Sequence, residues 1–341
     1  MNRKKNSPTI YDVAAAAKVS TATVSRVFSN SNYPVSSQTR EQILSIAAEL
    51  GYVYKRTPVP AGERRDVHVL VPNLENPFYM ALIDGMEASL RAYDLNMILM
   101  NTNDSLQQER KIIASLAARK SAVILSPITS ETQHLNMLLD SGCELVLIEQ
   151  FLSSHCSSIQ FNSCAGGRMA TEYLIERGLR RIAYLSPALI RPTRKGVYQG
   201  FEQAMENHQI PVCPELVCVG DDSDGSQADT IEIGVELCRK LLAGAAQIPE
   251  GICCENDLIA VGAMGYLLRQ GIRVPEDVSV IGLDNIPFGS LVFPGLTTVD
   301  QCTREMGSLA AELIHGNLMD PARKRVQLLL EPRLVIRDSV I

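Results

Sequence analysis

The segment Thr9–Tyr52 restricts how this chain can fold more than any other part of the sequence. It opens with TIYDVAAAAKVSTATVSRVF (9–28), in which small apolar residues recur at helical spacing and Thr9 and Ser20 stand where helix caps are needed. These features predict one helix over about 10–17 and a second over about 21–28. Two short helices joined by the tight connection 18–20 form a helix-turn-helix.

A third helix is expected over SQTREQILSIAAEL (37–50), between Ser36 as its cap and Gly51, which suits a left-handed helix end. The apolar residues expected to fill the core of the three helices are Val13, Val19, Val24, Val27, Ile43, Leu44, Ile46, Ala47 and Leu50. Residues 1–52 are therefore expected to form a separate all-α domain. An ordinary three-helix subdomain is the less specific alternative.

The second helix of a helix-turn-helix lies in the major groove of DNA, with its N-terminal side chains toward the bases. Thr21, Ala22 and Arg26 are therefore the expected base-reading residues. Arg26 is the strongest of the three, because its guanidinium can pair with O6 and N7 of guanine. The other expected DNA contacts, mostly to phosphates, are Thr9, Ser20, Thr23, Ser25, Asn30, Lys55 and Arg56.

The distribution of charge supports the same interpretation. Residues 1–65 contain ten Lys and Arg and four acidic residues, whereas the rest of the chain contains 22 basic and 34 acidic residues. A basic head of charge +6 therefore precedes an acidic body of charge −12. Only the head is expected to meet a polyanion such as double-stranded DNA.

These residues resemble the N-terminal domain of the lactose-repressor (LacI/GalR) family of bacterial transcription regulators. The resemblance continues in family order through VLVPNLENPFY, RRIAYLSP, ENDLIAVGAMGYLLRQGIRVPEDVSVIGLDNIPF and LTTVDQ, and so covers nearly the whole chain. It implies a DNA-binding regulator, most often a repressor, that is controlled by a small sugar-like effector. An activator or a corepressor-dependent regulator remains the alternative.

From Val67 onward, apolar runs of strand length alternate with helical stretches, which predicts two doubly wound α/β lobes. The expected strands are VHVLVP, NMILMNT, AVILSPI and ELVLIEQ in the first lobe and RRIAYLSP, PELVCVG, EGICCEN and VSVIGLD in the second. The expected helices are 77–93, 107–119, 131–141, 165–178, 194–208, 227–243 and 257–270.

The family resemblance implies that this body is like the periplasmic sugar-binding proteins, whose ligand lies between the lobes. It also implies that the chain returns to lobe one at LTTVD and to lobe two at VQLLLEPRLVIRDS. We therefore expect lobe one at about 67–160 and 297–320, and lobe two at about 161–296 and 321–341. Residues 53–66 are expected to form a linker.

Open α/β sheets bind ligands beyond the carboxyl ends of their strands, and polar or aromatic side chains follow several of the expected strands. The effector contacts expected from this placement are Asn73, Asn76, Phe78, Tyr79, Ser126, Glu149, Asn256, Asp257 and Asp284. Asn76 or Asp257 could instead be a simple helix cap.

The chain departs from the family pattern at several expected effector contacts. Val197 stands where relatives usually carry an effector-gripping Arg, and Arg191 or Arg194 could substitute for it. Asp222 stands where an aromatic residue often stacks on the ligand. A cleft with Asp222, Asp257 and Asp284 favours a polyhydroxylated or partly cationic ligand, unless Asp222 simply points to solvent.

The linker VYKRTPVPAGERRD (53–66) also departs from the family, whose members usually carry a short hinge helix there that ends in a DNA-kinking leucine. Pro58 and Pro60 oppose such a helix, because proline inside a helix costs about 3 kcal/mol. We favour an extended spacer with reduced DNA bending. A distorted turn with Val59 as a weaker wedge is the alternative.

Other functions find little support in the sequence. It has no Gly-x-Ser-x-Gly elbow and no phosphate loop, and its five His residues are scattered, so we expect neither an enzyme nor a metal or cofactor site. The polar start and the absence of an 18-residue apolar run predict a cytoplasmic protein, which argues against an exported solute-binding protein. The nine Cys residues are expected to be buried reduced thiols, with a redox sensor as the alternative.

A single head with few base contacts binds DNA weakly, so paired heads on a pseudo-palindromic site are expected. Helix 77–93 presents the apolar residues Met80, Ile83, Met86 and Leu90 at helical spacing, and we expect the homodimer to form there. The alternative is that this stripe is ordinary lobe core.

We predict that Arg26→Ala weakens binding to the preferred DNA site by about 1–3 kcal/mol and relaxes the choice of base at one guanine. Gel-shift titrations with the preferred site and with single-base variants measure both effects. Unchanged base preference in the variant would contradict the assignment of Arg26.

Overall fold

The computed structural model describes residues 10–29, 36–50, 52, 65–128, 133–152, 155–221 and 230–341. At its N-terminal end, three helices form the head: α1 (Ile10–Ala17), α2 (Thr21–Ser29) and α3 (Ser37–Leu50). They confirm the three helices expected from the sequence. Ser20 caps α2, because its Oγ accepts a hydrogen bond from the Thr23 N–H at 3.1 Å.

The head encloses a small apolar core, as expected, but two of the predicted core residues are wrong. The buried cluster contains Val13, Ala14, Ala17, Val24, Val27, Ile43 and Ala47, with Val19 and Ile46 at its edge. Leu44 and Leu50 are 43% and 41% exposed. Leu44 is turned about 100° from Ile43 around the helix, and Leu50 lies one turn past Ala47, where Tyr52 packs against the cluster instead.

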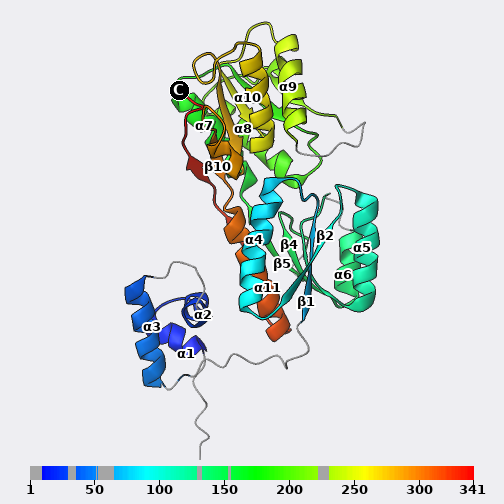
Figure 1. Cartoon of the computed structure of the whole chain (residues 1–341), viewed down its shortest axis with the longest axis vertical. Helices are drawn as coiled ribbons and strands as arrows, with labels where there is room; N and C mark the ends of the chain where they lie inside the picture. The colour runs from blue at the N-terminus through cyan, green and yellow to red at the C-terminus, as the bar shows by residue number, and fades with distance from the viewer. Residues whose placement is uncertain are drawn as a thin grey trace, which may run out of the picture. The chain divides into compact units, whose positions relative to one another are not determined.

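The body contains two six-stranded sheets, one in each lobe (Figure 1). Sheet order in lobe one is β11-β5-β4-β3-β1-β2, with β1 (Asp66–Val71), β2 (Asn96–Asn101), β3 (Ala122–Leu125), β4 (Glu144–Ile148), β5 (Ser157–Phe161) and β11 (Gln327–Leu330). Sheet order in lobe two is β12-β10-β9-β8-β6-β7, with β6 (Ile182–Ser186), β7 (Val217–Val219), β8 (Gly251–Cys254), β9 (Ser279–Leu283), β10 (Thr297–Asp300) and β12 (Arg333–Val335).

Helices connect these strands in the alternation expected of doubly wound lobes. They are α4 (Pro77–Ala92), α5 (Leu106–Arg119), α6 (Gln133–Asp140), α7 (Ser163–Glu176), α8 (Pro192–Asn207), α9 (Ile231–Gly244), α10 (Asp257–Arg269) and α11 (Thr303–Met319), with short 3-10 turns η1 (Pro214–Leu216) and η2 (Pro287–Ser290). The central strands β3, β6, β8 and β9 are buried along their whole length, which explains their continuous apolar sequences.

The chain crosses between the lobes at places that differ from the expected ones. LTTVD stays in lobe two, because β10 pairs in parallel with β9, and only α11 after it packs on the sheet of lobe one. VQLLL then pairs with β5 of lobe one, and β12 alone returns to lobe two. Long-range strand pairing decides these positions, and pairing partners are not encoded in local periodicity.

The three crossings are tied to one another by short contacts. The Asn162 side chain donates hydrogen bonds to both carboxylate oxygens of Glu331, at 3.2 and 3.3 Å. The Asn162 N–H donates to the Leu330 carbonyl, and the Cys302 thiol donates to the Glu331 carbonyl at 3.9 Å. The connections between the lobes therefore form one bundle.

The apolar stripe of α4 belongs to the core of lobe one. Ile83, Met86 and Leu90 are buried, whereas Met80 is half exposed. The expected dimer surface on this stripe is therefore wrong for three of its four residues, and the alternative of ordinary lobe core is correct for them. Figure 1 shows α4 beside α11, and the Ser308 hydroxyl of α11 donates to the Gly85 carbonyl.

Burial also decides the chemistry of the cysteines. All nine are free, and six of them are buried, whereas Cys164, Cys213 and Cys218 are partly exposed. Burial raises the pKa of Cys238 and of Cys253 to about 12, so these two groups stay protonated and unreactive at neutral pH. Among the helices that the structure describes, none combines the length and the apolar content that crossing a membrane requires.

We predict that Gly307→Ala destabilises the protein by about 1–3 kcal/mol. A Cβ atom at residue 307 would collide with the backbone carbonyl of Leu82, because α11 and α4 are in direct contact there. Urea unfolding measures the change. Gly265→Ala is the matched control: its Cβ meets only the Arg269 side chain at 3.6 Å, so the variant should gain up to about 1 kcal/mol. Equal effects of the two substitutions would contradict the packing argument.

Candidate functional site: a polar pocket between the lobes

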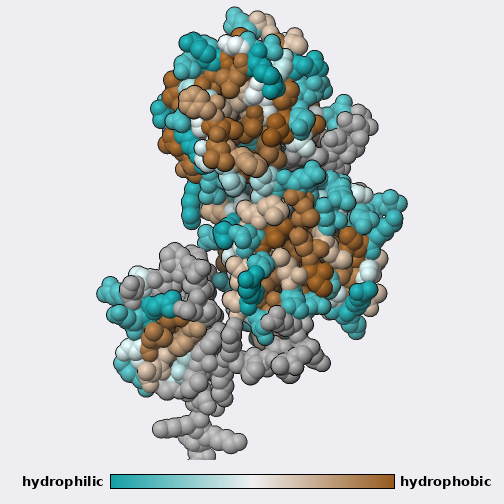
Figure 2. Space-filling model, in the orientation of Figure 1, coloured by the Kyte–Doolittle hydropathy of each residue, from teal (hydrophilic) through white to brown (hydrophobic). Residues whose placement is uncertain are grey.

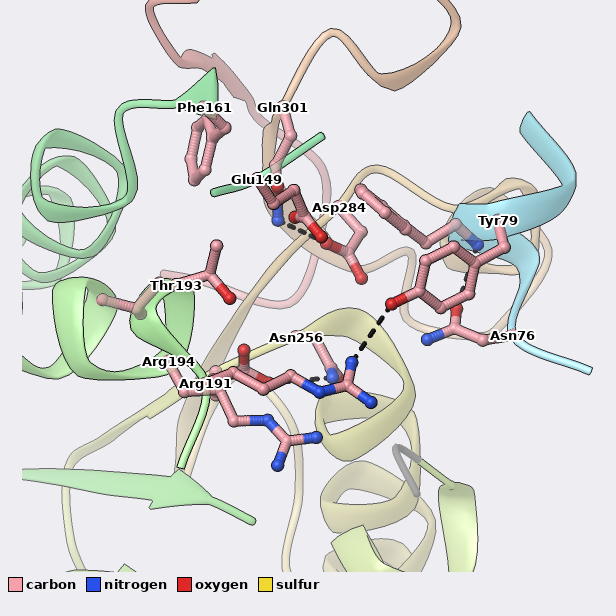
Figure 3. Close-up of a pocket in the computed structure, with 13 residues that line it drawn as sticks. Asn76, Tyr79, Glu149, Phe161, Arg191, Thr193, Arg194, Asn256, Asp284 and Gln301 are labelled. Carbon is pink, nitrogen blue, oxygen red and sulfur yellow. Dashed lines mark hydrogen bonds between the residues drawn. The ribbon is translucent and has the colours of Figure 1, made fainter. Parts of the chain in front are cut away.

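A pocket lies between the two lobes, beyond the carboxyl ends of both sheets (Figure 3). Lobe one contributes residues that follow β1 and β4 and the last residue of β5. Lobe two contributes residues from the N-cap and first two turns of α8 and residues that follow β8, β9 and β10. The lining consists of Asn76, Phe78, Tyr79, Glu149, Phe161, Arg191, Thr193, Arg194, Val197, Glu255, Asn256, Asp284 and Gln301. Parallel strands bring these chain segments together because their ends share one sheet edge.

Eight of the twelve effector contacts expected from the sequence line this one pocket: Asn76, Phe78, Tyr79, Glu149, Arg191, Arg194, Asn256 and Asp284. Their role in binding a ligand stays a prediction. Two of them are helix caps as well. Asn76 Oδ1 accepts the Phe78 N–H, and Asn256 Oδ1 accepts the Ile259 N–H, both at 2.9 Å. Capping and pocket lining are therefore compatible at these positions.

Four expected contacts are not among the lining residues. Ser126 is buried, with its hydroxyl 3.5 Å from Glu149 Oε2, and Asn73 donates instead to Asp104. Asp222 lies outside the described residues. Asp257 is fully buried and does not line the pocket, so its role as a direct effector contact stays a prediction that the pocket geometry does not support.

Asp257 holds the chain segment that follows β9 through hydrogen bonds. Its carboxylate accepts hydrogen bonds from the Thr298 hydroxyl at 2.5 Å and from the Ile286 N–H at 2.9 Å. Burial raises its pKa to about 7, although both hydrogen bonds and the charge of Arg337 act in the opposite direction. Asp257 therefore fixes the segment after β9, which carries Asp284 to the pocket.

Two acidic residues of the pocket have unusual backbone conformations. Glu149 follows β4 with φ of +61°, and Asp284 follows β9 with φ of +117°. Non-glycine residues rarely adopt such values, and residues that do are concentrated at functional sites. Gln301 donates a hydrogen bond to Asp284 Oδ1 (Figure 3). The pocket thus presents an oriented carboxylate from each lobe.

The two arginines of the pocket differ in their contacts. Arg194 is almost fully buried and donates to the Ala188 carbonyl at 3.0 Å. Arg191 extends toward lobe one, where its Nη1 donates to the Tyr79 hydroxyl at 3.1 Å (Figure 3) and its Nη2 pairs with Asp104 at 2.6 Å. Arg191 therefore connects the two lobes.

Sequence reasoning did not select five lining residues: Phe161, Thr193, Val197, Glu255 and Gln301. Glu255 and Gln301 directly follow β8 and β10, so the strand-end rule could have found them. Val197 is a departure from the family pattern, and Phe161 is the last residue of β5. Thr193 lies in the first turn of α8 and carries no signal of its own.

The head presents α2 as its expected DNA-reading helix. The hydroxyls of Ser20 and Thr23 are 2.8 Å apart, so Ser20 is engaged in capping while it remains exposed. Thr21 is half-buried in the first turn. Ala22, Ser25 and Arg26 lie on α2, but their side chains are not among those described. Thr9, Asn30, Lys55 and Arg56, and the linker from 53 to 64, lie outside the described residues.

A helix-turn-helix head and a two-lobe α/β body with a polar interlobe pocket define the class of protein. Comparison with protein families agrees: residues 9–54 match the bacterial regulatory proteins of the lacI family, and residues 171–340 match a periplasmic binding protein-like domain. The HTH-type transcriptional repressor PurR of Vibrio cholerae is 32% identical over 97% of this chain and 98% of its own length.

Solved structures give the same result. A complex of the transcriptional regulator CelR with cellobiose has a TM-score of 0.72 and 30% identity, over 97% of this chain and 99% of that one. A LacI family regulator from Enterococcus faecium with bound ribose has a TM-score of 0.72 and 25% identity, over 81% and 98%. The chain belongs to the lacI family of bacterial regulatory proteins. It is a DNA-binding transcriptional regulator and not an enzyme.

We predict that Asp257→Asn changes how stability depends on pH. The folded-state pKa of about 7 exceeds the ordinary 3.8, so the folded chain retains a proton that the unfolded chain releases between about pH 4 and 7. This group therefore lowers the free energy of unfolding as the pH rises through that window. Urea unfolding measures the free energy of unfolding of Asp257→Asn minus that of wild type. This difference should rise by up to about 4 kcal/mol between pH 4 and pH 7.

Asp277→Asn is the control for this prediction. Hydrogen bonds from Arg273 lower the pKa of Asp277 to about 2, so its contribution is fully present above the ordinary value of 3.8. The difference in the free energy of unfolding between Asp277→Asn and wild type should stay constant above about pH 5. Parallel pH profiles for wild type and Asp257→Asn would refute the role given to Asp257.

Proposed function

We propose that this protein is a repressor that binds a pseudo-palindromic operator as a homodimer and responds to a small effector between its lobes. The observation that carries the proposal is the combination of a capped helix-turn-helix with a polar pocket built from both lobes of a separate body. Because its proposed partner is chromosomal DNA, we propose that the protein works in the cytoplasm.

The homodimer requires a surface other than the buried stripe of α4. Met80 on α4 and Ile98 and Leu99 on β2 are exposed apolar residues of lobe one. Strand β2 is at the edge of its sheet, and Figure 2 shows apolar surface on lobe one in the region of α4 and β2. Exposed apolar surface of this kind is typical of interfaces, so we place the homodimer contact there.

The effector is proposed to be polyhydroxylated and neutral or partly cationic. Three carboxylates line the pocket, from Glu149, Glu255 and Asp284, against two guanidinium groups. One of these groups, that of Arg191, is already paired with Asp104. Carboxylates that accept from hydroxyl or ammonium groups form strong charge-assisted hydrogen bonds. The bound cellobiose and ribose of the two related structures are consistent with a sugar-like ligand.

Ligand binding is expected to change the angle between the lobes and with it the distance between the paired heads. The pocket has a cavity volume of about 30 Å³, room for about two waters, so a sugar must move side chains or lobes to enter. The effector can shift DNA affinity only by its differential affinity for the two arrangements.

The proposed function is tested by selecting bound fragments from genomic DNA and then screening metabolites for their release. Enrichment of pseudo-palindromic sites, with affinity that falls steeply as salt rises, is the expected result. A protein that retains no duplex at low salt would refute the proposal.

We predict that the effector, or the sugar that binds most tightly in the screen, binds at least about tenfold more tightly than its phosphate ester, because the carboxylates repel an anion. Isothermal titration calorimetry measures both constants. Asp284→Asn should reduce the difference in affinity between the sugar and its phosphate ester. Asp277→Asn, on the surface of lobe two, should leave this difference unchanged. Tighter binding of the phosphate ester would contradict the proposed ligand class.

A further inference from the structure

The loop after β2 is built to present one carboxylate. Asn103 and Asp104 have φ values of +51° and +52°, two successive left-handed residues without a glycine. Asn101 stabilises this turn, because its side chain accepts the Asn103 N–H at 2.9 Å and donates to Asn103 Oδ1 at 2.6 Å. The Asp104 N–H donates to the Pro72 carbonyl at 2.8 Å. Such a conformation persists only where the surroundings enforce it.

The Asp104 carboxylate is held on both of its oxygens. Asn73 of lobe one donates to Oδ2 at 3.1 Å, and Asn73 is itself oriented by the Glu75 N–H at 2.7 Å. Arg191 of lobe two pairs with Oδ1 at 2.6 Å. The Asp104 and Arg191 side chains are only 12% and 10% exposed, so water screens this ion pair weakly.

The partner in lobe two is equally constrained. Arg191 is the residue before Pro192 and the N-cap of α8, with an extended backbone of φ −82° and ψ 142°. Proline at the first helical position fixes this geometry. The Arg191 side chain therefore extends from a backbone position that is fixed at the start of α8. Its guanidinium donates to the Tyr79 hydroxyl at 3.1 Å and pairs with Asp104. Both contacts cross from lobe two to lobe one.

We propose that Asp104 is a positioning residue of the effector site: it anchors Arg191 across the cleft, and their ion pair holds the two lobes closed. Arg191 lines the pocket and Asp104 does not, so Asp104 acts through the arginine. Two consequences follow. Opening of the cleft must separate this pair, and a bound ligand meets a guanidinium whose charge is already balanced. This inference rests on the proposed role of the pocket as the effector site.

The test is hydrogen exchange of the ligand-free full-length protein, followed by mass spectrometry of peptides that cover residues 72–80 and 186–195. Asp104→Asn keeps the shape of the side chain and removes its charge. We expect exchange in both peptides to become roughly tenfold faster, because the substitution removes the buried ion pair that joins the two lobes. Asp277→Asn, which breaks an exposed ion pair with Arg273, should leave both peptides at the wild-type rate.

Arg191→Gln breaks the same pair from lobe two and keeps the test available if Asp104→Asn does not fold. The double variant Asp104→Asn/Arg191→Gln distinguishes positioning from a general structural role. If the two residues act through one ion pair, the double variant exchanges no faster than the faster single variant, whereas independent roles make the effects multiply. The proposal would be overturned if the single variants exchanged at the wild-type rate, or if the increases in exchange rate multiplied in the double variant.

This experiment uses neither DNA nor effector. Failure of the anchor would therefore leave the operator and effector proposals untouched, and a protein without an operator could still show the anchor. Within the effector proposal, the anchor adds one expectation. Asp104→Asn should improve binding of the phosphate ester relative to the parent sugar, because it removes a carboxylate that pairs with Arg191 and so makes the pocket less negative.

Discussion

The hydrogen bonds from Asn162 to Glu331 join two of the three places where the chain crosses between the lobes, and the Cys302 contact joins the third. Because the three crossings are in contact with one another, the lobes are held so that the carboxyl ends of the strands in both sheets face one pocket. A ligand between the lobes can therefore act on both at once, which is the physical requirement for effector control.

Charged groups of the body either line the pocket or hold the groups that line it. Glu149 and Asp284 are presented in left-handed conformations, Asp257 fixes the segment that carries Asp284, and Asp104 balances Arg191. Buried charges without partners are costly, so each of these groups constrains its neighbours. The same constraint that stabilises the body also defines which ligand charge it accepts.

Local sequence patterns were sufficient for much of this structure. The caps and spacing of residues 9–50 predict α1, α2 and α3 nearly to the residue, because helix ends depend on nearby hydrogen bonds. Eight of the twelve strands in the described residues match expected apolar runs, whereas β5 is not among those runs and β2 has no buried residue. Leu44, Leu50 and the α4 stripe were misplaced, because an apolar face shows that a residue can be buried but not what covers it.

The sequence by itself determined the class of this protein: a basic helix-turn-helix head, an acidic two-lobe α/β body and polar residues at strand ends, all of which follow from local spacing and charge. Only the tertiary structure decided that β10 remains in lobe two, that Asp257 is buried outside the pocket lining and that Asp104 meets Arg191. Asp104 and Arg191 are far apart along the chain. Their contact arises from the packing of two sheets, and no local pattern of residues encodes it.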